Sequence, residues 1–254
     1  MMKNKVGLVM GMANEYSIAY GISKSLINNG ANILFTAQSD RFKQKITDME
    51  EFKNNKVFIC DVSDDNNIEQ LFSSIKQEYG SIDFIVHSIA FSDRKELQGK
   101  YYNTSRSNFL NAMDISCYSL TKVCQYASSV MNNGGSIVTL TYYGSEKTVP
   151  NYNVMGVVKA ALESSVRYLA SDLGEFNIRV NAVSAGPIKT LASSGVGEFS
   201  KVLDYEKNRS PLQRNITKEE VGNVCTFLLS EFSSGITGEI IHVDCGCNTV
   251  GIKF

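Results

Sequence analysis

Seven short apolar runs, rich in β-branched residues and separated by segments with a helical period, most constrain how this chain can fold. Continuous hydrophobicity of this kind suits parallel strands that helices cover on both faces, whereas a strand with one solvent face alternates apolar and polar residues. The pattern therefore predicts an α/β fold with a seven-stranded, doubly wound parallel sheet in a single domain over residues 1–254. The expected strands are Val6–Met10, Ile33–Thr36, Val57–Cys60, Phe84–His87, Ile137–Thr141, Arg179–Val183 and Ile240–Val243.

Length and charge narrow the classes of partner. A chain of 254 residues is long enough to bury such a sheet, and its formal net charge of -1 gives no general attraction to phosphate backbones or anionic lipid. We therefore expect no nucleic-acid partner and no membrane partner. The segment before Gly11 is too short for a signal sequence with a cleavage site, which predicts a cytoplasmic protein.

Cysteine and histidine spacing gives no sign of a metal site. No two cysteines have the C-x-x-C spacing, and His87 and His242 are each isolated in apolar surroundings, which is typical of core or edge residues. We predict no metal and interpret the cysteines as buried thiols. The cysteines are Cys60, Cys117, Cys124, Cys225, Cys245 and Cys247.

Two long helices are expected at Arg106–Met131 and Tyr152–Leu173. Both carry small or apolar residues over more of their circumference than one core-facing stripe needs. This favours packing against another subunit, with more extensive burial inside one chain as the alternative. The Gly- and Ser-rich stretch Ala185–Glu198 follows a predicted strand at the edge where ligands bind in such sheets, and we interpret about 185–210 as a mobile lid over a substrate site.

The turn after the first strand is a candidate phosphate site. Gly11 leads through a short turn to Ser17 and Ile18, where a helix begins, so backbone N–H groups at the helix start could hold a pyrophosphate. The turn lacks the G-x-G-x-x-G fingerprint, and a tight turn needs glycine in any case.

The ends of the next strands indicate which dinucleotide would bind. Gln38 stands where an acidic residue usually holds the adenosine ribose, and its amide can bond the ribose hydroxyls without a charge. Asp40 would repel a 2′-phosphate, which favours NADH over NADPH, although Arg41 keeps NADPH open. Asp61 and the residue after it, Val62, could contact the nucleoside, with a helix N-cap as the alternative role for Asp61.

Tyr152 and Lys159 are seven residues apart in a segment that we expect to be helical. Seven residues make two turns, so both side chains should point the same way. The cation can hold a cofactor while the phenol, whose ordinary pKa of about 10 a nearby positive charge would lower, donates a proton. The spacing indicates acid catalysis beside a hydride donor, whereas Met155, four residues before Lys159, has no proton to give.

A second phenol, Tyr142, closes the fifth predicted strand. It could assist proton donation, or it could be an aromatic plug at the end of the sheet. Tyr143 would point to the opposite side if the strand pleat continues, and we interpret it as a packing residue.

These segments, taken in order, carry a family resemblance. They are Gly11-x5-Ser17-Ile18-Ala19, Gln38, Asp61-Val62, His87-Ser88-Ile89, Asp114-Ile115-Ser116, Tyr142, Pro150 to Gly156, Lys159, Arg179-Val180-Asn181-Ala182 and Ser184 to Ala192. The chain closely resembles the bacterial enoyl-[acyl-carrier-protein] reductases of the short-chain dehydrogenase/reductase superfamily, over nearly its whole length. The resemblance implies a Rossmann-like homotetramer that uses NADH to reduce trans-2-enoyl thioesters on acyl carrier protein in fatty acid elongation.

The resemblance also implies site residues. Ser92, Tyr142 and Tyr152 would contact substrate, with Tyr142, Tyr152 and Lys159 as the catalytic set. The cofactor would be bound by Gly11, Ser17, Ile18, Gln38, Asp61, Val62, Ile89, Lys159, Ile188, Lys189, Thr190, Leu191 and Ala192. Two departures stand out: Ala90 replaces a glycine of many relatives beside the expected acyl pocket, and the lid segment from Gly195 to Lys201 has one basic residue, although the carrier protein is acidic.

The chemistry of enoyl reduction agrees with the position of Tyr152. Hydride goes to C3 while negative charge develops on the thioester oxygen, so the acid must stand farther from the nicotinamide than in ketone reduction. Three residues of helix between Tyr152 and Met155 correspond to about 4.5 Å. Two alternatives are a ketoreductase or alcohol dehydrogenase of the same fold, which the missing Tyr at 155 and Ser at 142 oppose, and a non-catalytic NAD(H)-sensing protein.

Overall fold

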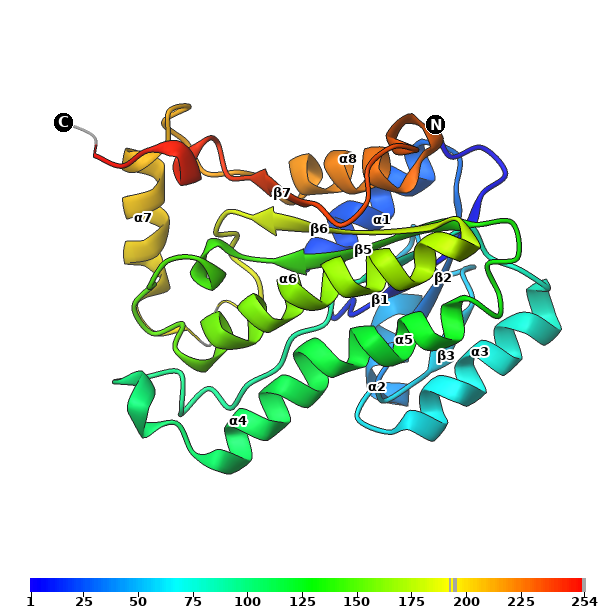
Figure 1. The fold of residues 1–254 in the computed structure, drawn as a ribbon, viewed down its shortest axis with the longest axis horizontal. Helices are drawn as coiled ribbons and strands as arrows, with labels where there is room; N and C mark the ends of the chain where they lie inside the picture. Colours follow the sequence, from blue (N-terminus) through cyan, green and yellow to red (C-terminus); the bar gives the residue numbers. More distant parts are fainter. Residues whose placement is uncertain (192, 194–195, 253–254) are drawn as a thin grey trace.

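The computed structural model describes residues 1–191, 193 and 196–252, and these form one seven-stranded sheet between two layers of helices (Figure 1). The strand order is β3-β2-β1-β4-β5-β6-β7, and every neighbouring pair is parallel. The predicted doubly wound, Rossmann-like α/β fold is confirmed. The strands are β1 Val6–Met10, β2 Asn32–Ala37, β3 Val57–Ile59, β4 Phe84–His87, β5 Gly135–Thr141, β6 Ile178–Ala185 and β7 Ile240–Val243.

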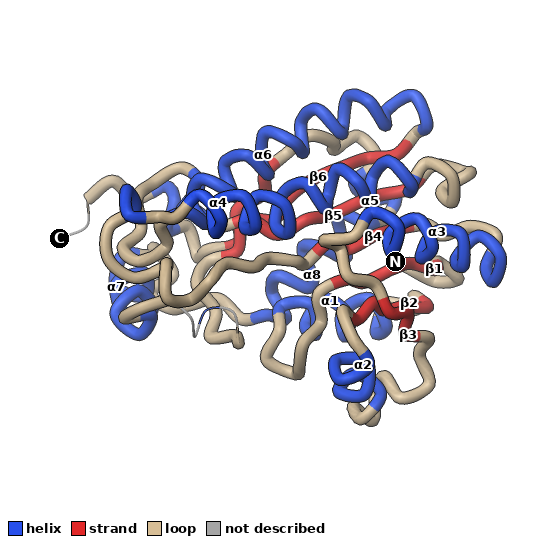
Figure 2. Tube along the Cα trace, turned by 90° about the horizontal axis from the view of Figure 1, so that it is seen from below, coloured by secondary structure: helices blue, strands red, loops and turns tan. Residues whose placement is uncertain are grey.

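Helices cover both faces of the sheet, as Figure 2 shows from below. The first face is covered by α3 Asp65–Tyr79, α4 Arg106–Met113, α5 Ser119–Ala127 and α6 Val154–Leu173, and the second by α1 Ile18–Asn28, α2 Asp40–Thr47 and α8 Lys218–Leu229. Helix α7 Phe199–Arg209 lies beyond the carboxyl ends of the strands. Short 3-10 turns are η1 Tyr101–Asn103, η3 Tyr143–Ser145, η4 Gly174–Phe176, η6 Glu231–Ser233 and η7 Cys247–Thr249.

Each face of the sheet has its own apolar core. Along β1, Leu8 and Met10 pack into the core under α3 to α6, while Val9 packs into the core under α1 and α8. Successive strand residues point to opposite faces, so a strand buried on both sides must be apolar at every position. This is why the continuous runs predicted all seven strands to within two residues at either end.

The first long helix was predicted as one element, and that is wrong in detail. Between α4 and α5 the chain makes one π-helical segment, η2 Asp114–Tyr118, and the helix then ends at Ala127 rather than Met131. Such segments occur often at functional sites, and no residue pattern marks this one in advance. Among the described residues, no helix combines the length and apolarity needed to cross a membrane.

The second long helix starts later than predicted. α6 begins at Val154, and the preceding Asn153 has a φ of 42° that ends any helical path back to Tyr152. Tyr152 therefore lies in the turn before the helix, and the prediction that it shares a helical face with Lys159 is wrong. The two side chains reach one cavity by a different route, from a turn and from a helix.

Candidate active site

A cavity of about 1180 Å³ opens at the carboxyl ends of the strands, where β1 and β4 lie at the centre of the sheet. This is the position where doubly wound sheets bind ligands, because the chain connections diverge there. Of the predicted site residues, those that line it are Gly11, Ser17, Ile18, Gln38, Ile89, Ser92, Tyr142, Tyr152, Lys159, Ile188, Thr190 and Leu191. Asp61, Val62 and Lys189 are not among the lining residues, and Ala192 lies outside the described residues.

The turn from β1 to α1 forms one wall. Gly11 has a φ of 89°, and a Cβ there would lie 2.0 Å from the carbonyl oxygen of Ser88, so only glycine lets β1 and β4 approach this closely. The Ser17 hydroxyl accepts hydrogen bonds from the backbone N–H groups of Ala13 and Asn14, at 3.2 and 3.1 Å. Because Ser17 makes no capping bond to α1, no side chain at the N-cap satisfies the first N–H groups of this helix.

Gln38 and Asp61 form a polar pair at the ends of β2 and β3. The Gln38 amide donates to the Asp61 carboxylate at 3.0 Å, and Ser63 donates to the other carboxylate oxygen. Partial burial raises the pKa of Asp61, but these hydrogen bonds outweigh it and hold the pKa below its usual value. Asp64, rather than Asp61, caps α3, so the alternative role for Asp61 as a helix cap is wrong.

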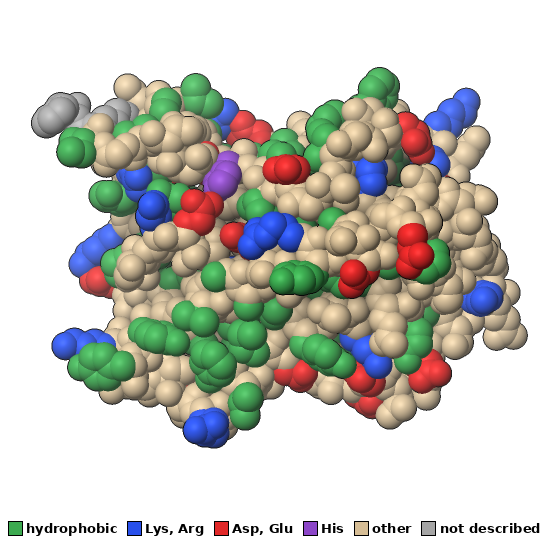
Figure 3. All heavy atoms as spheres, in the orientation of Figure 1, with side chains coloured by type: hydrophobic (Ala, Val, Ile, Leu, Met, Phe, Trp, Pro, Cys, Tyr) green, Lys and Arg blue, Asp and Glu red, His purple; other side chains and the backbone are tan. Residues whose placement is uncertain are grey.

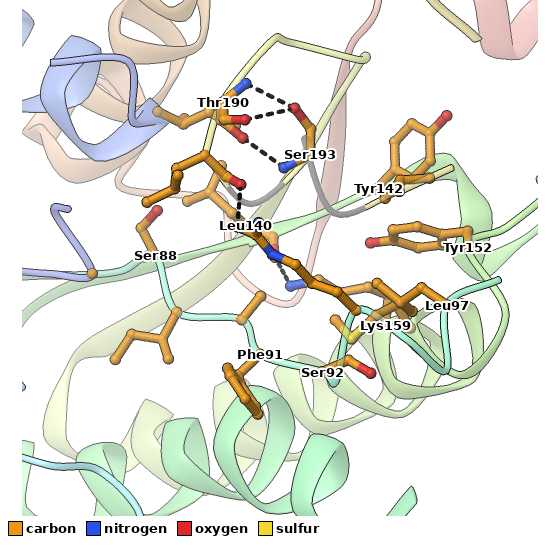
Figure 4. A pocket seen from close by; sticks show the side chains of 18 of the residues that line it. Ser88, Phe91, Ser92, Leu97, Leu140, Tyr142, Tyr152, Lys159, Thr190 and Ser193 are labelled. Atoms are coloured by element: carbon orange, nitrogen blue, oxygen red, sulfur yellow. Dashed lines mark hydrogen bonds between the residues drawn. The ribbon is translucent and has the colours of Figure 1, made fainter. Parts of the chain in front are cut away.

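Lys159 is buried on α6 with 5% of its surface exposed. Its ammonium donates to the carbonyl oxygen of Leu140 in β5 at 2.7 Å. Burial lowers the pKa of Lys159 to about 8, while Cys117 and then Glu163 act in the opposite direction. The labelled side chains of Lys159 and Tyr152 both point into the cavity in Figure 4.

Tyr152 is a neutral phenol in this site. Burial raises its pKa above the ordinary value, and Tyr142 and Glu163 add to the shift. The prediction that a nearby cation would lower the pKa of Tyr152 is therefore wrong, because removal from water disfavours the charged phenolate. A phenol that stays protonated at neutral pH can donate a hydrogen bond or a proton, and it cannot act as a base.

Gly144 makes room for the Tyr152 ring and Gly156 makes room for Gly144, and the sequence pattern did not point to Gly144 as a site residue. A Cβ on Gly144 would lie 2.5 Å from Cδ1 of Tyr152, and a Cβ on Gly156 would lie 2.6 Å from the Gly144 carbonyl oxygen.

Tyr142 contributes a wall of the cavity. Its ring packs edge to face on Tyr152, and its hydroxyl is buried without a hydrogen-bond partner among the described residues. Burial, together with Glu206 and Cys247, raises its pKa. Tyr143 points to the other side of the strand, as predicted. It is buried between the His242 ring and the Arg209 guanidinium, whose Cζ lies 5.7 Å from the centroid of the Tyr143 ring.

His87 is a core residue, as predicted. Its ring nitrogens bond the hydroxyls of Thr139 and Ser119, at 3.1 and 2.8 Å, and burial lowers its pKa to about 3. All six cysteines are buried, which confirms that prediction as well. In the described part of the chain, no group of three or more His, Cys, Asp and Glu side chains could hold a metal ion.

Comparison with known proteins gives a consistent result. The family model described as Enoyl-(Acyl carrier protein) reductase matches residues 11–248. A curated relative in Rhizobium meliloti, enoyl-[acyl-carrier-protein] reductase [NADH] 1, is 54% identical over 254 residues, which are 100% of this chain and 93% of the relative. A Bacillus cereus relative with the NADH enoyl-reductase name is 48% identical over 99% of both chains.

Solved structures agree with these relatives. The Anaplasma phagocytophilum enoyl-(acyl-carrier-protein) reductase in complex with NAD has a TM-score of 0.96 and 50% identity, covering 100% of this chain and 97% of that one. The Bacillus cereus enoyl-acyl carrier protein reductase with NADP+ and an indole naphthyridinone has a TM-score of 0.96 and 48% identity, covering 99% of each chain. Sequence and structure comparisons thus lead to the same family.

Proposed function

Since the chain belongs to the enoyl-[acyl-carrier-protein] reductase family, we propose that it reduces the trans-2 double bond of enoyl thioesters on acyl carrier protein, with NADH, in fatty acid elongation. The observation that carries this proposal is the placement of the acid. The Tyr152 side chain and the Lys159 ammonium point into one cavity, while the position four residues before Lys159 is occupied by Met155. The phenol is therefore displaced from the site that ketone reduction requires.

The cavity has the donors and acceptors that a reduced nicotinamide dinucleotide needs. The uncapped N-terminus of α1, behind the Gly11 turn, suits the pyrophosphate, and the Gln38–Asp61 pair suits the adenosine ribose. The residues proposed to hold NADH are Gly11, Ser17, Ile18, Gln38, Asp61, Val62, Ile89, Lys159, Ile188, Lys189, Thr190, Leu191 and Ala192. When bound, NADH supplies the hydride that adds to C3 of the enoyl group.

Tyr152 and Lys159 then act on the charge that the substrate develops. Negative charge accumulates on the thioester oxygen, and the Tyr152 phenol, protonated at neutral pH, donates a hydrogen bond to it. The positive charge of Lys159, held against Leu140, stabilises the same enolate and binds the nicotinamide ribose. Ser92 would contact the substrate, and the Tyr142 ring shapes the pocket around the acyl chain.

The carrier protein must deliver the acyl chain to the mouth of this cavity. Lys201 in the lid is paired with Glu198, which leaves it less available to an acidic partner. Arg94 and Lys95 are exposed residues of the cavity lining, and within the described residues neither forms an ion pair, although Arg94 donates to the Leu191 carbonyl at 3.1 Å. We therefore place the approach of the acidic carrier on the side of Arg94 and Lys95.

Self-association is proposed on the outer face of α4, η2 and α6. Large apolar side chains are exposed there, and Figure 3 shows hydrophobic side chains gathered over this part of the surface. They are Leu110 at 59%, Tyr118 at 46%, Val157 at 38% and Tyr168 at 73% exposure. A patch of this kind is costly in water and fits subunit packing, which supports the homotetramer.

Light scattering of the purified protein measures the number of subunits directly. The cytoplasmic location stays a prediction.

The reaction is tested by following the absorbance of NADH with a crotonyl thioester and, in parallel, with an acetoacetyl thioester. The proposed function predicts rapid NADH oxidation with the enoyl substrate alone. Oxidation only with the ketone would replace this proposal with ketone reduction, and no oxidation with either substrate despite NADH binding would favour a nucleotide-sensing protein.

A further inference from the structure

Two consecutive residues of β5 hold two charged side chains of α6. The Leu140 carbonyl accepts from the Lys159 ammonium at 2.7 Å, and the next residue, Thr141, donates its hydroxyl to the Glu163 carboxylate at 2.5 Å. Lys159 and Glu163 are four residues apart, so they lie on adjacent turns of the same helix face. The strand thus fixes a cation and an anion side by side under the cavity.

Both charges are removed from water. Lys159 is 5% exposed and Glu163 is 8% exposed. A buried charge without compensation is expensive, and a group in that position normally loses its charge instead. The two charges are held on neighbouring residues of β5, and the charge of Glu163 raises the pKa of Lys159 across the low-dielectric interior.

The other groups that face Lys159 supply no comparable negative charge at neutral pH. Burial keeps His87 on β4 neutral, and the phenols of Tyr142 and Tyr152 stay protonated. Cys117 on η2 also raises the pKa of Lys159, but it is a buried thiol, which carries no charge while it holds its proton. Among these groups, Glu163 is the carboxylate that acts on Lys159. The hydrogen bond from Thr141 fixes the position of this carboxylate.

We propose that Glu163 is a positioning residue for the reaction: its carboxylate, fixed by Thr141, keeps Lys159 protonated and directed toward the cavity. The proposal rests on the proposed function, because it concerns the role of Lys159 in that reaction. Glu163 itself touches neither substrate nor cofactor, and it acts through the charge of Lys159.

The proposal has a specific pH consequence. Lys159 has a pKa of about 8 with Glu163 in place, so its ammonium is present below that pH and is lost above it. An opposite charge nearby holds the ammonium on, so removal of that charge lowers the pKa of Lys159 further. The fall in activity on the basic side then begins at a lower pH, while activity at acidic pH is kept.

Glu163→Gln is the direct test, because the glutamine keeps the size of the side chain and an oxygen to accept from Thr141. We expect the basic limb of kcat/KM to move down by about one pH unit, which lowers activity roughly tenfold above the limb and little near pH 6. Glu163→Asp keeps the charge, so its kcat/KM should fall at nearly the same basic pH as that of the wild type. Thr141→Val removes only the hydrogen bond and should move the limb less than Glu163→Gln does.

A second readout does not depend on turnover. The affinity for NADH is titrated by fluorescence over the same pH range. As pH rises, this affinity should begin to fall at a lower pH in Glu163→Gln than in the wild type. Glu206→Gln on α7 removes another buried carboxylate, 8% exposed, and serves as the matched control that leaves both limbs in place.

Equal loss of activity at every pH in Glu163→Gln, with an unmoved limb in both readouts, would overturn the proposal and leave Glu163 a structural role. If the glutamine variant does not fold, Thr141→Val decides it: a wild-type limb in that variant, in both readouts, would overturn the proposal. A wild type that binds NADH with the expected pH limb yet reduces no enoyl thioester would refute the proposed function and not the pairing of Glu163 with Lys159.

Discussion

The rings of Tyr142 and Tyr152 meet edge to face, with centroids 5.0 Å apart and planes at 79°, yet their hydroxyls point in different directions. In Figure 4 the Tyr152 hydroxyl points toward the space that Lys159 enters, whereas the Tyr142 hydroxyl points away from it. The two phenols therefore have different roles, because only the Tyr152 hydroxyl points to the place where the substrate carbonyl would lie. Tyr142 offers its ring to the cavity and keeps its hydroxyl in the protein.

Tyr142→Phe should keep most of the enoyl reductase activity and raise stability. The substitution preserves the ring and removes a buried hydroxyl that has no hydrogen-bond partner among the described residues. Relief of an unsatisfied buried group is expected to add about 1 kcal/mol to the free energy of unfolding. Denaturant unfolding and steady-state kinetics check this. A loss of turnover of a hundredfold would show instead that the Tyr142 hydroxyl takes part in proton donation.

Gly144→Ala should displace the Tyr152 ring without unfolding the protein. The new methyl would lie 2.5 Å from Cδ1 of Tyr152, so the ring must move. A shift of about 1 Å in a catalytic group is expected to lower kcat by roughly a hundredfold. Gly174→Ala is the control, since its Cβ would meet nothing within 4 Å. Equal kcat values for the two variants would refute the close approach of Gly144 to Tyr152.

Gln38→Arg should open the site to NADPH. An arginine there would pair with a 2′-phosphate in place of the present amide, which donates to Asp61. A charge-assisted bond of this kind should improve kcat/KM for NADPH by about tenfold or more. Gln44→Arg on α2 adds the same charge outside the residues that line the cavity. An equal gain from that variant would attribute the effect to net charge alone.

The sequence predicts this fold well because each strand is buried on both faces, and burial leaves a continuous apolar run. It fails where a single residue changes the backbone path. Asn153 takes a positive φ that asparagine tolerates and that no apolar pattern reveals, so the start of α6 and the place of Tyr152 were misjudged. The Tyr152–Lys159 pair was identified from spacing, but the Leu140 carbonyl that holds Lys159 is a backbone group, which a sequence cannot single out.

Buried thiols should make the protein less stable in alkali. Burial raises the pKa of Cys225, so this thiol stays protonated in the folded state while the unfolded chain ionises near pH 9. The folded state then binds more protons, and the free energy of unfolding falls as pH rises. Between about pH 8 and about pH 10 the wild type should lose about 1.4 kcal/mol more than Cys225→Ala. Parallel denaturant titrations measure the difference, and equal losses would place Cys225 in contact with water.

Tyr152→Phe tests the central claim most directly, with kcat for a crotonyl thioester and the Kd for NADH measured on the same preparation. The phenylalanine keeps the ring against Gly144 and Tyr142 and removes only the proton that the enolate needs. We predict that kcat falls by about a hundredfold or more while the Kd for NADH changes by less than about threefold. A variant that keeps wild-type kcat would contradict the assignment of Tyr152 as the acid.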